Sequence, residues 1–313
     1  MQCPYLIFFL LCKMNQEIKG HFPNNIELFI KREDFLHPII SGNKFRKLKY
    51  NIQEAKKLGH TTWLTFGGAF SNHILAVAAA GAEFGFKTIG IIRGEELERK
   101  IAENPTLAKA QELGMQFHFV SRTAYRDKES SSFISYLQEK WGPFYLIPEG
   151  GTNDLAIKGC EEILTFEDKS FFTHITCAVG TGGTISGLIN SSTEKQEIIG
   201  FSSLKGAFLS EVIRNFVVKT NWSISDTYHF GGYGKVNDEL IQFLNSFYSQ
   251  TAIPLDPVYT GKMVFGVLDL IEKGYFPPNA KILMIHTGGL QGIKGMNFAL
   301  KKKNKEIIVY DER

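Results

Sequence analysis

Cysteine and long apolar runs are both scarce in this chain. The cysteines are Cys3, Cys12, Cys160 and Cys177. No two of them form a CxxC pair, which argues against a zinc motif or a disulfide framework. The apolar stretch from Tyr5 to Leu11 is too short to span a bilayer, and it lacks a basic leader and a small-residue cleavage site. We expect reduced thiols, no metal, no membrane contact and a cytoplasmic protein, with Met14 as an alternative start.

An excess of charge of one sign is also missing. The chain has 35 Lys and Arg against 32 Asp and Glu, for a net charge of +3, and the basic residues form no tail or arm. Nucleic acid is therefore not an expected partner. A length of 313 residues with 43% hydrophobic residues indicates a globular chain of one large or two ordinary domains.

What the chain does have is a regular alternation of strand and helix patterns between residues 60 and 150. Strands are predicted at 63–66, 87–94, 115–121 and 144–151. Helices are predicted between them at 71–85, 104–114 and 130–142. This order predicts a parallel, twisted sheet that is covered on both faces.

A second series of elements follows. Before the first series, a strand is predicted at 26–32 and a helix from Lys44. In the second series, helices are predicted at 153–166 and 184–192, and strands at 174–179, 197–204 and 280–287. We expect an α/β protein with two doubly wound parallel-sheet domains. Residues 1–46 and 152–313 would form the larger, cofactor-binding domain, and residues 47–151 the smaller, inserted one. Ligands bind such sheets at the carboxyl ends of the strands.

The loop AVGTGGTISG, residues 178–187, joins a predicted strand to a predicted helix. Its glycines let backbone amides approach an anion closely, and the helix N-terminus adds positive potential, so the loop favours a phosphate. A dinucleotide fingerprint would need glycine in place of Ile185, and a P-loop would need lysine in place of Leu188. A nucleotide is therefore disfavoured. The alternative is a tight turn that binds nothing.

The segment SGNKFRKL, residues 41–48, begins a predicted amphipathic helix. Lys44 lies in its first turn, and Lys47 lies one turn further on the same side. A helix N-terminus and a like charge both lower the pKa of an ammonium group, which prepares Lys44 for a Schiff base. Lys47 would stay charged and pair with the phosphate. The alternative is a solvated basic face of a surface helix.

The segment GGAFSNH, residues 67–73, is a second glycine turn between a strand and a helix. Its amides and the Ser71 hydroxyl can hold a substrate carboxylate. Asn72 can donate a hydrogen bond to a phenolic oxygen. His73 is either a polar contact or acid/base group of the site, or a structural histidine.

Two later segments complete the pattern. DPVYTGK contributes Tyr259, whose ring can stack on a flat cofactor or belong to the core, and HTGG places the Thr287 hydroxyl at the end of the last predicted strand. A phosphate loop, an amine-forming lysine, an asparagine and a stacking tyrosine together fit one cofactor, pyridoxal 5′-phosphate.

The motifs GNKFRKL, GGAFSNH, VGTGGT, DPVYTGK and HTGG, in this order, resemble the D-cysteine desulfhydrase and 1-aminocyclopropane-1-carboxylate deaminase family. The family consists of fold type II pyridoxal-phosphate enzymes related to the tryptophan synthase β subunit. The resemblance covers about residues 26 to 295, and it implies a small amino-acid substrate and a homodimer.

By position, the resemblance also implies roles for individual residues. It implies that the catalytic residues are Lys44, Ser71 and Tyr259. It implies cofactor contacts from Lys44, Lys47, Asn72, Val179, Gly180, Thr181, Gly182, Gly183, Thr184, Tyr259 and Thr287. It implies substrate contacts from Ser71, Asn72, His73, Thr260 and Gly288. Whether Lys44 or Ser71 removes the α-proton stays open, as does the threonine that contacts the ring nitrogen.

Thr260 and Thr287 favour one branch of this family. Deaminases of the cyclopropane amino acid carry glutamate at the first position and a bulky apolar residue at the second. A carboxylate at the ring nitrogen keeps it protonated and deepens the electron sink that ring opening needs, whereas expulsion of a thiolate needs it less. We therefore expect β-elimination of D-cysteine to pyruvate, ammonia and sulfide.

Three alternatives stay open beside this expectation. The first is a cyclopropane-acid deaminase that gives 2-oxobutyrate and ammonia, and the second is a cofactor-binding protein without turnover. The third follows from Phe70, which stands where the family usually has a polar residue and can redirect the pocket. The substrate would then be another D-amino acid or a β-substituted alanine.

Overall fold

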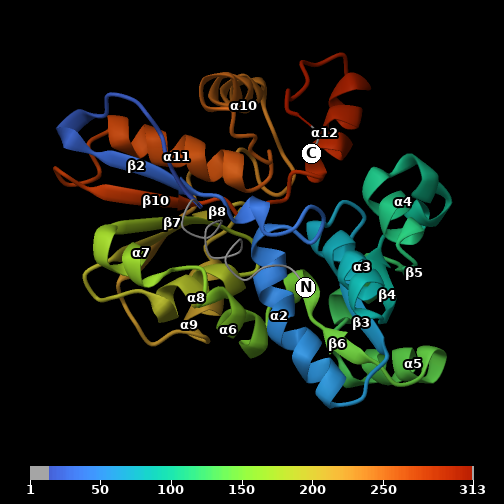
Figure 1. The fold of residues 1–313 in the computed structure, drawn as a ribbon. Coiled ribbons are helices and arrows are strands. Elements are labelled where there is room, and N and C mark those ends of the chain that lie inside the picture. The colour runs from blue at the N-terminus through green and yellow to red at the C-terminus, as the bar shows by residue number, and fades with distance from the viewer. Residues whose placement is uncertain (1–13, 312–313) are drawn as a thin grey trace, which may run out of the picture.

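The computed structural model describes residues 14–311, which form two β-sheets flanked by helices (Figure 1). The larger sheet has the strand order β1-β2-β10-β7-β8-β9. Its strands are β1 (Asn15–Glu17), β2 (Glu27–Lys31), β7 (His174–Val179), β8 (Glu197–Ser202), β9 (Trp222–Ser225) and β10 (Lys281–Ile285). The predicted apolar run from Tyr5 to Leu11 lies outside the described residues, as do Cys3 and Cys12.

The smaller sheet has the strand order β5-β4-β3-β6, and all its strands are parallel. Its strands are β3 (Thr62–Gly68), β4 (Lys87–Arg93), β5 (Gln116–Val120) and β6 (Tyr145–Ile147). The helices are α2 (Gly42–Lys57), α3 (Asn72–Phe84), α4 (Pro105–Glu112), α5 (Ser131–Trp141), α6 (Asp154–Cys160), α7 (Phe166–Phe171), α8 (Gly183–Ser191), α9 (Leu209–Arg214), α10 (Asp238–Thr251), α11 (Thr260–Glu272) and α12 (Gly292–Lys301).

Helices cover both faces of each sheet, as a doubly wound fold requires. In β10, Ile282 and Met284 pack on the face covered by α10 and α11, whereas Leu283 and Ile285 pack on the face covered by α8. This alternation follows from the two-residue period of a strand. In strand β3 of the smaller sheet, Trp63 packs on the face covered by α3, and Leu64 and Phe66 pack on the face covered by α5. The predicted α/β fold class with two parallel sheets is confirmed.

The structure corrects two details of this prediction. The helix predicted over 153–166 ends at Cys160, and a separate helix, α7, begins at Phe166 after Thr165, the N-cap of a capping box in which its side chain and that of Asp168 each accept a backbone N–H. The larger sheet is not purely parallel, because β1 pairs antiparallel with β2 at one edge. The prediction also left out β9 and the helices α9 to α12.

Helix α2 lies between the two sheets (Figure 1). The strands at 62–147 form one sheet, and the strands at 15–31 and 174–285 form the other. The precise domain boundaries, at residues 46 and 151, stay a prediction. Over residues 14–311, no helix combines the length and apolar character that crossing a bilayer requires, and no three His, Cys, Asp or Glu side chains are grouped to hold a metal.

Candidate active site

A cavity of about 600 Å³ lies where the carboxyl ends of strands from both sheets meet. This is the position at which α/β sheets bind ligands. Its lining includes most of the predicted site residues, which are Lys44, Lys47, Ser71, Asn72, His73, Val179, Gly180, Thr181, Gly182, Thr184, Tyr259, Thr287 and Gly288. Segments far apart in the sequence therefore meet in one place.

The N-terminus of α2 is fixed between two of these loops. Gly42 has a φ of +51°, and a Cβ there would lie 2.0 Å from the carbonyl oxygen of Thr287, so only glycine fits. The backbone N–H of Asn43 donates to that same oxygen at 3.2 Å. Its side chain donates from Nδ2 to Oγ1 of Thr184 at 2.7 Å. Helix α2 thus starts in contact with both the HTGG segment and the phosphate loop.

Lys44, the third residue of α2, extends into the cavity and is partly buried. Burial, and after it the charge of Lys47, lower its pKa to about 7. The helix N-terminus and Lys47 were the predicted causes of this shift. Desolvation is instead the leading cause, because the cavity walls displace the water that would solvate the ammonium group. Near neutral pH, a large fraction of Lys44 is therefore an uncharged amine.

Lys47 is 2% exposed and is held beside the phosphate loop. Its Nζ donates to the carbonyl oxygen of Gly150 and to Oγ1 of Thr152, both at 3.0 Å. A Cβ on Gly183 would lie 3.1 Å from this Nζ. Gly183 itself is not part of the cavity lining, but as the first residue of α8 it lets Lys47 reach the helix N-terminus. The two together form a site for an anion.

Ser71 caps α3 as predicted. Its Oγ accepts hydrogen bonds from the backbone N–H groups of His73 and Ile74, at 3.2 and 3.4 Å. Because those bonds use the lone pairs, the hydroxyl hydrogen stays available to donate to a ligand in the cavity. The cap therefore orients Ser71 without using up its donor.

Asn72 and His73 occupy the first turn of α3. The Asn72 Oδ1 atom is buried and has no hydrogen-bond partner within residues 14–311. His73 Nε2 lies 2.8 Å from Oγ1 of Thr65, whose own hydrogen goes to the carbonyl of Ile147, so Nε2–H is the donor. Burial and then the nearby lysines lower the pKa of His73 well below 6.5. His73 is thus a neutral imidazole and not a cationic partner for a carboxylate.

The ring of Tyr259 lies close to the phosphate loop. A Cβ added at Gly180 would be only 3.0 Å from this ring. Thr260 does not line the cavity, which corrects its expected position beside the substrate. Its side chain is fully buried, and Oγ1 donates to Oδ2 of Asp256 at 3.2 Å and accepts from the Asp256 N–H at 2.9 Å. Its hydroxyl is therefore used to hold the DPVYTGK turn.

The cavity also contains residues that the sequence motifs did not indicate. They are Arg93, Arg122, Glu149 and Tyr233. The rings of Tyr233 and Tyr259 pack edge to face with centroids 6.1 Å apart. Arg93 ends β4, so the rule that ligands bind at the carboxyl ends of strands could have found it. Tyr233 had only the weak signal of a tyrosine among glycines, in FGGYG.

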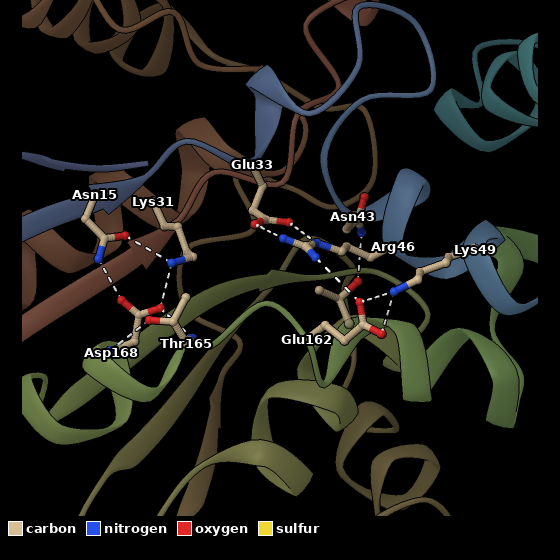
Figure 2. A network of polar contacts seen from close by, with 10 residues as sticks. Asn15, Lys31, Glu33, Asn43, Arg46, Lys49, Glu162, Thr165 and Asp168 are labelled. Atoms are coloured by element: carbon tan, nitrogen blue, oxygen red, sulfur yellow. Dashed lines mark hydrogen bonds and ion pairs between the residues drawn. The ribbon is translucent and has the colours of Figure 1, made fainter. Parts of the chain in front are cut away.

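Arg46 and Lys49 do not line the cavity and point instead into a network of acids (Figure 2). Arg46 forms two hydrogen bonds with the buried carboxylate of Glu33, at 2.8 and 2.9 Å. Lys49 lies 2.6 Å from Glu162. Since Glu33 follows β2 and Glu162 follows α6, this network attaches α2 to the larger sheet. The site thus brings a lysine with a lowered pKa and a glycine turn at a helix N-terminus into one cavity, an arrangement that suits a Schiff base and an anion.

Comparisons with known proteins give the family. A model of the pyridoxal-phosphate dependent enzymes matches residues 17–288, and the chain belongs to this family. A putative 1-aminocyclopropane-1-carboxylate deaminase of Pyrococcus abyssi is 31% identical over 288 residues, which cover 86% of both chains. The mitochondrial bifunctional D-cysteine desulfhydrase/1-aminocyclopropane-1-carboxylate deaminase of Arabidopsis thaliana is 32% identical, with 87% of this chain and 74% of that protein covered.

A solved structure agrees with these relatives. The crystal structure of an ACC deaminase homologue superposes with a TM-score of 0.72 at 27% identity, covering 91% of this chain and 95% of the other. The cofactor is thus pyridoxal phosphate, and the residues present fit it. The Lys44 amine suits its aldehyde, and Lys47 with the glycine turn suits its phosphate. The buried Oδ1 atom of Asn72, which has no hydrogen-bond partner among residues 14–311, can accept a hydrogen bond from a polar group of its ring.

Proposed function

We propose that this enzyme is a lyase that deaminates a small amino acid by β-elimination, in the manner of a D-cysteine desulfhydrase, giving pyruvate, ammonia and sulfide. The supporting observation is the scarcity of carboxylates. Among the described residues that line the cavity, Glu149 is the only acid, and it is bonded to Tyr125 and Lys128 beside the smaller sheet. Thr287, at the end of β10, offers a hydroxyl instead. Loss of a good leaving group needs less electron withdrawal than ring opening does.

The bound cofactor supplies the electron sink for this reaction. In the proposal, Ser71 donates its free hydroxyl hydrogen to the substrate carboxylate, and Lys47 with residues 179–184 holds the phosphate. The α-proton goes to the uncharged Nζ of Lys44, or to Oγ of Ser71 after that hydroxyl has passed its own proton to Nζ of Lys44. The Cβ–S bond breaks, sulfur leaves with the electron pair, and the released aminoacrylate reacts with water to give pyruvate and ammonia. No oxidant or reductant is needed.

Substitution of Ser71 separates the two candidate bases. If Lys44 removes the α-proton, Ser71→Ala keeps exchange of the α-hydrogen with deuterated solvent and mainly raises KM. If Ser71 removes it, this exchange is lost. Nuclear magnetic resonance of the recovered substrate measures the exchange directly.

The second candidate function is deamination of 1-aminocyclopropane-1-carboxylate to 2-oxobutyrate and ammonia. It is supported by the names of several relatives. An assay of the keto acid formed from D-cysteine, L-cysteine and the cyclopropane acid separates the two. We expect pyruvate from D-cysteine. Formation of 2-oxobutyrate from the cyclopropane acid, with no pyruvate from either cysteine, would contradict the first candidate.

Two parts of the sequence prediction concern the setting of the enzyme. We propose a cytoplasmic homodimer, and the unpaired, buried thiols of Cys160 and Cys177 support a reducing compartment. Light scattering of the purified protein measures its mass. A particle of twice the 35.2 kDa chain is expected, whereas a mass of one chain contradicts the dimer.

A further inference from the structure

Arg93 is the last residue of β4, and its side chain is exposed at the cavity. It pairs in register with Gly68 of β3, which begins the turn before Ser71. A Cβ on Gly68 would lie 3.8 Å from Nη2 of Arg93. The guanidinium carbon lies 5.7 Å from the ring centroid of Tyr125. The side chain thus reaches from the smaller sheet toward the site.

The cations of the cavity differ in how their charge is used. Lys44 has a lowered pKa, and Lys47 is bonded beside the phosphate loop. Arg122 is paired with Glu96 at 2.7 Å. The guanidinium of Arg93 has no hydrogen bond or ion pair with any residue in the part of the chain that the structure describes. Its charge is therefore available to a ligand.

The acid lining the cavity does not neutralise Arg93. Glu149 accepts a hydrogen bond from the hydroxyl of Tyr125 at 2.9 Å and lies 3.4 Å from Nζ of Lys128. Its negative charge already has a cationic partner. An arginine with five N–H donors and no acceptor suits a carboxylate, phosphate or sulfonate oxygen pair.

The strand order indicates which end of the substrate Arg93 would meet. Ser71, at the start of α3, follows β3 and is placed for the α-carboxylate. Arg93 ends β4, the neighbouring strand, so its backbone lies one strand away from that turn. A group carried further along the substrate can therefore reach Arg93 while the α-carboxylate stays at Ser71. Tyr233 lines the same cavity, and its ring packs against Tyr259.

We propose that Arg93 forms a subsite for an anionic group on the β-substituent of the substrate. The substrate class is then an alanine whose β-substituent carries a negative charge, such as a phosphate, sulfate or sulfinate. This inference rests on the proposed β-elimination for its chemistry. With O-phosphoserine, the α-proton is removed, the Cβ–O bond breaks, and phosphate leaves with the electron pair. Aminoacrylate and water then give pyruvate and ammonia.

The test compares ligands that differ in this charge. O-Phosphoserine and serine, each in the D and L forms, are titrated into the holoenzyme, and the shift of its near-visible absorption band gives Kd. Pyruvate release from O-phosphoserine and from β-chloroalanine is measured in parallel. Variants Arg93→Ala and Arg93→Lys are compared with Arg99→Ala, which removes an exposed arginine that does not line the cavity.

In the wild-type enzyme we expect O-phosphoserine to bind more tightly than serine. Arg93→Ala should raise the Kd of O-phosphoserine about 10-fold to 100-fold, which is the usual effect of losing a charge-assisted hydrogen bond. The Kd of serine should change by less than about twofold. Arg93→Lys should keep part of the preference, and Arg99→Ala all of it. Equal weakening of both ligands in Arg93→Ala would overturn the inference, because Arg93 would then serve the α-carboxylate or the fold.

The two proposals fail in different ways. If the binding preference follows Arg93 but no substrate gives pyruvate, the subsite stands and the β-elimination fails. If pyruvate forms from β-chloroalanine and Arg93→Ala changes no preference, the β-elimination stands and the subsite fails. A wild-type enzyme that binds serine more tightly than O-phosphoserine also contradicts the subsite.

Discussion

The two sides of helix α2 carry similar charges with opposite uses. On one side, Lys44 and Lys47 extend toward the cavity, and burial lowers the pKa of both. On the other side, Arg46 and Lys49 bond to Glu33 and Glu162 (Figure 2). The four cations within six residues thus differ in their partners. Arg46 and Lys49 pair with acids and hold the helix in place, whereas Lys44 and Lys47 have no acid partner among the described residues and are available to a ligand in the cavity.

This difference has a simple physical basis. A buried ammonium without an acid is costly, and for Lys44 this cost is reduced because the proton is released near neutral pH. A buried guanidinium cannot release its proton, so it persists only beside a carboxylate. Lysine is therefore suited to the reactive side of α2, and arginine to the side that attaches it to β2.

Lys44→Ala should remove the amine on which the reaction depends. We expect keto-acid formation to fall by at least about 1,000-fold and the near-visible absorption band of the bound cofactor to change. Circular dichroism should stay as in the wild type, because Lys44 faces a cavity and not the core. A variant that keeps the band and a tenth of the activity would contradict this role.

Arg46→Met should act on stability instead of chemistry. It leaves the fully buried Glu33 carboxylate without its partner, which costs about 3 kcal/mol or more. The midpoint of urea unfolding should fall, while the folded fraction keeps its absorption band. If Arg46→Met left the urea midpoint unchanged and removed the absorption band of the cofactor, Arg46 would serve the cofactor and not the stability of the fold.

Lys47→Met should weaken cofactor binding. Loss of one charge-assisted contact to a phosphate predicts a Kd for pyridoxal phosphate about 10-fold to 100-fold higher. Equilibrium dialysis measures this change. Inorganic phosphate should compete with the cofactor in the wild type and less so in the variant. Equal competition in both proteins would place the phosphate elsewhere.

The pH dependence of cofactor capture should reveal the pKa of Lys44. Because its pKa falls from 10.5 to about 7, the rate of capture by the cofactor-free protein should rise with pH and level off above about 7. Lys47→Met should move this midpoint upward, since a like charge is removed. The unfolded chain binds more protons between pH 7 and 10.5, so this group makes the cofactor-free protein more stable as pH rises through that range. A capture midpoint near 10 would contradict the buried amine.

Lys49→Met should have the smallest effect. The Lys49 side chain is 41% exposed, and such ion pairs contribute about 0 to 1 kcal/mol. Urea unfolding and activity should both stay close to the wild type. This variant is the matched control for Arg46→Met, because it removes one cation from the same side of the helix and leaves Glu33 paired. A fall in the urea midpoint as large as that of Arg46→Met would contradict this expectation, because the Lys49–Glu162 pair would then stabilise the fold as much as the Arg46–Glu33 pair.

The sequence predicted those parts of the fold and site that local chemistry determines. Ser71 caps α3, and the glycine loop joins β7 to α8, because capping and turn preferences act over a few residues. The start of α7 was missed because the capping box of Thr165 lies inside a continuous helical pattern. Glycine loops at the ends of strands were sufficient to place one cavity.

Contacts between distant segments were harder to predict. Arg93 and Tyr233 reach the cavity only because two sheets face each other across α2, and no local pattern records that arrangement. The motif DPVYTGK predicted that Thr260 contacts the substrate, but in the structure its hydroxyl donates to Asp256 within the same turn. The cause of the Lys44 shift was also misjudged, because burial is a property of the assembled cavity and not of the helix start.

The most direct test is to reduce the holoenzyme with borohydride and map the modified peptide by mass spectrometry. Reduction fixes the cofactor to the amine that holds it. We expect a pyridoxyl label on Lys44, with Lys47 unmodified. A label on Lys47, or on any lysine outside the cavity, would contradict the central claim that the uncharged amine of Lys44 is the reactive group.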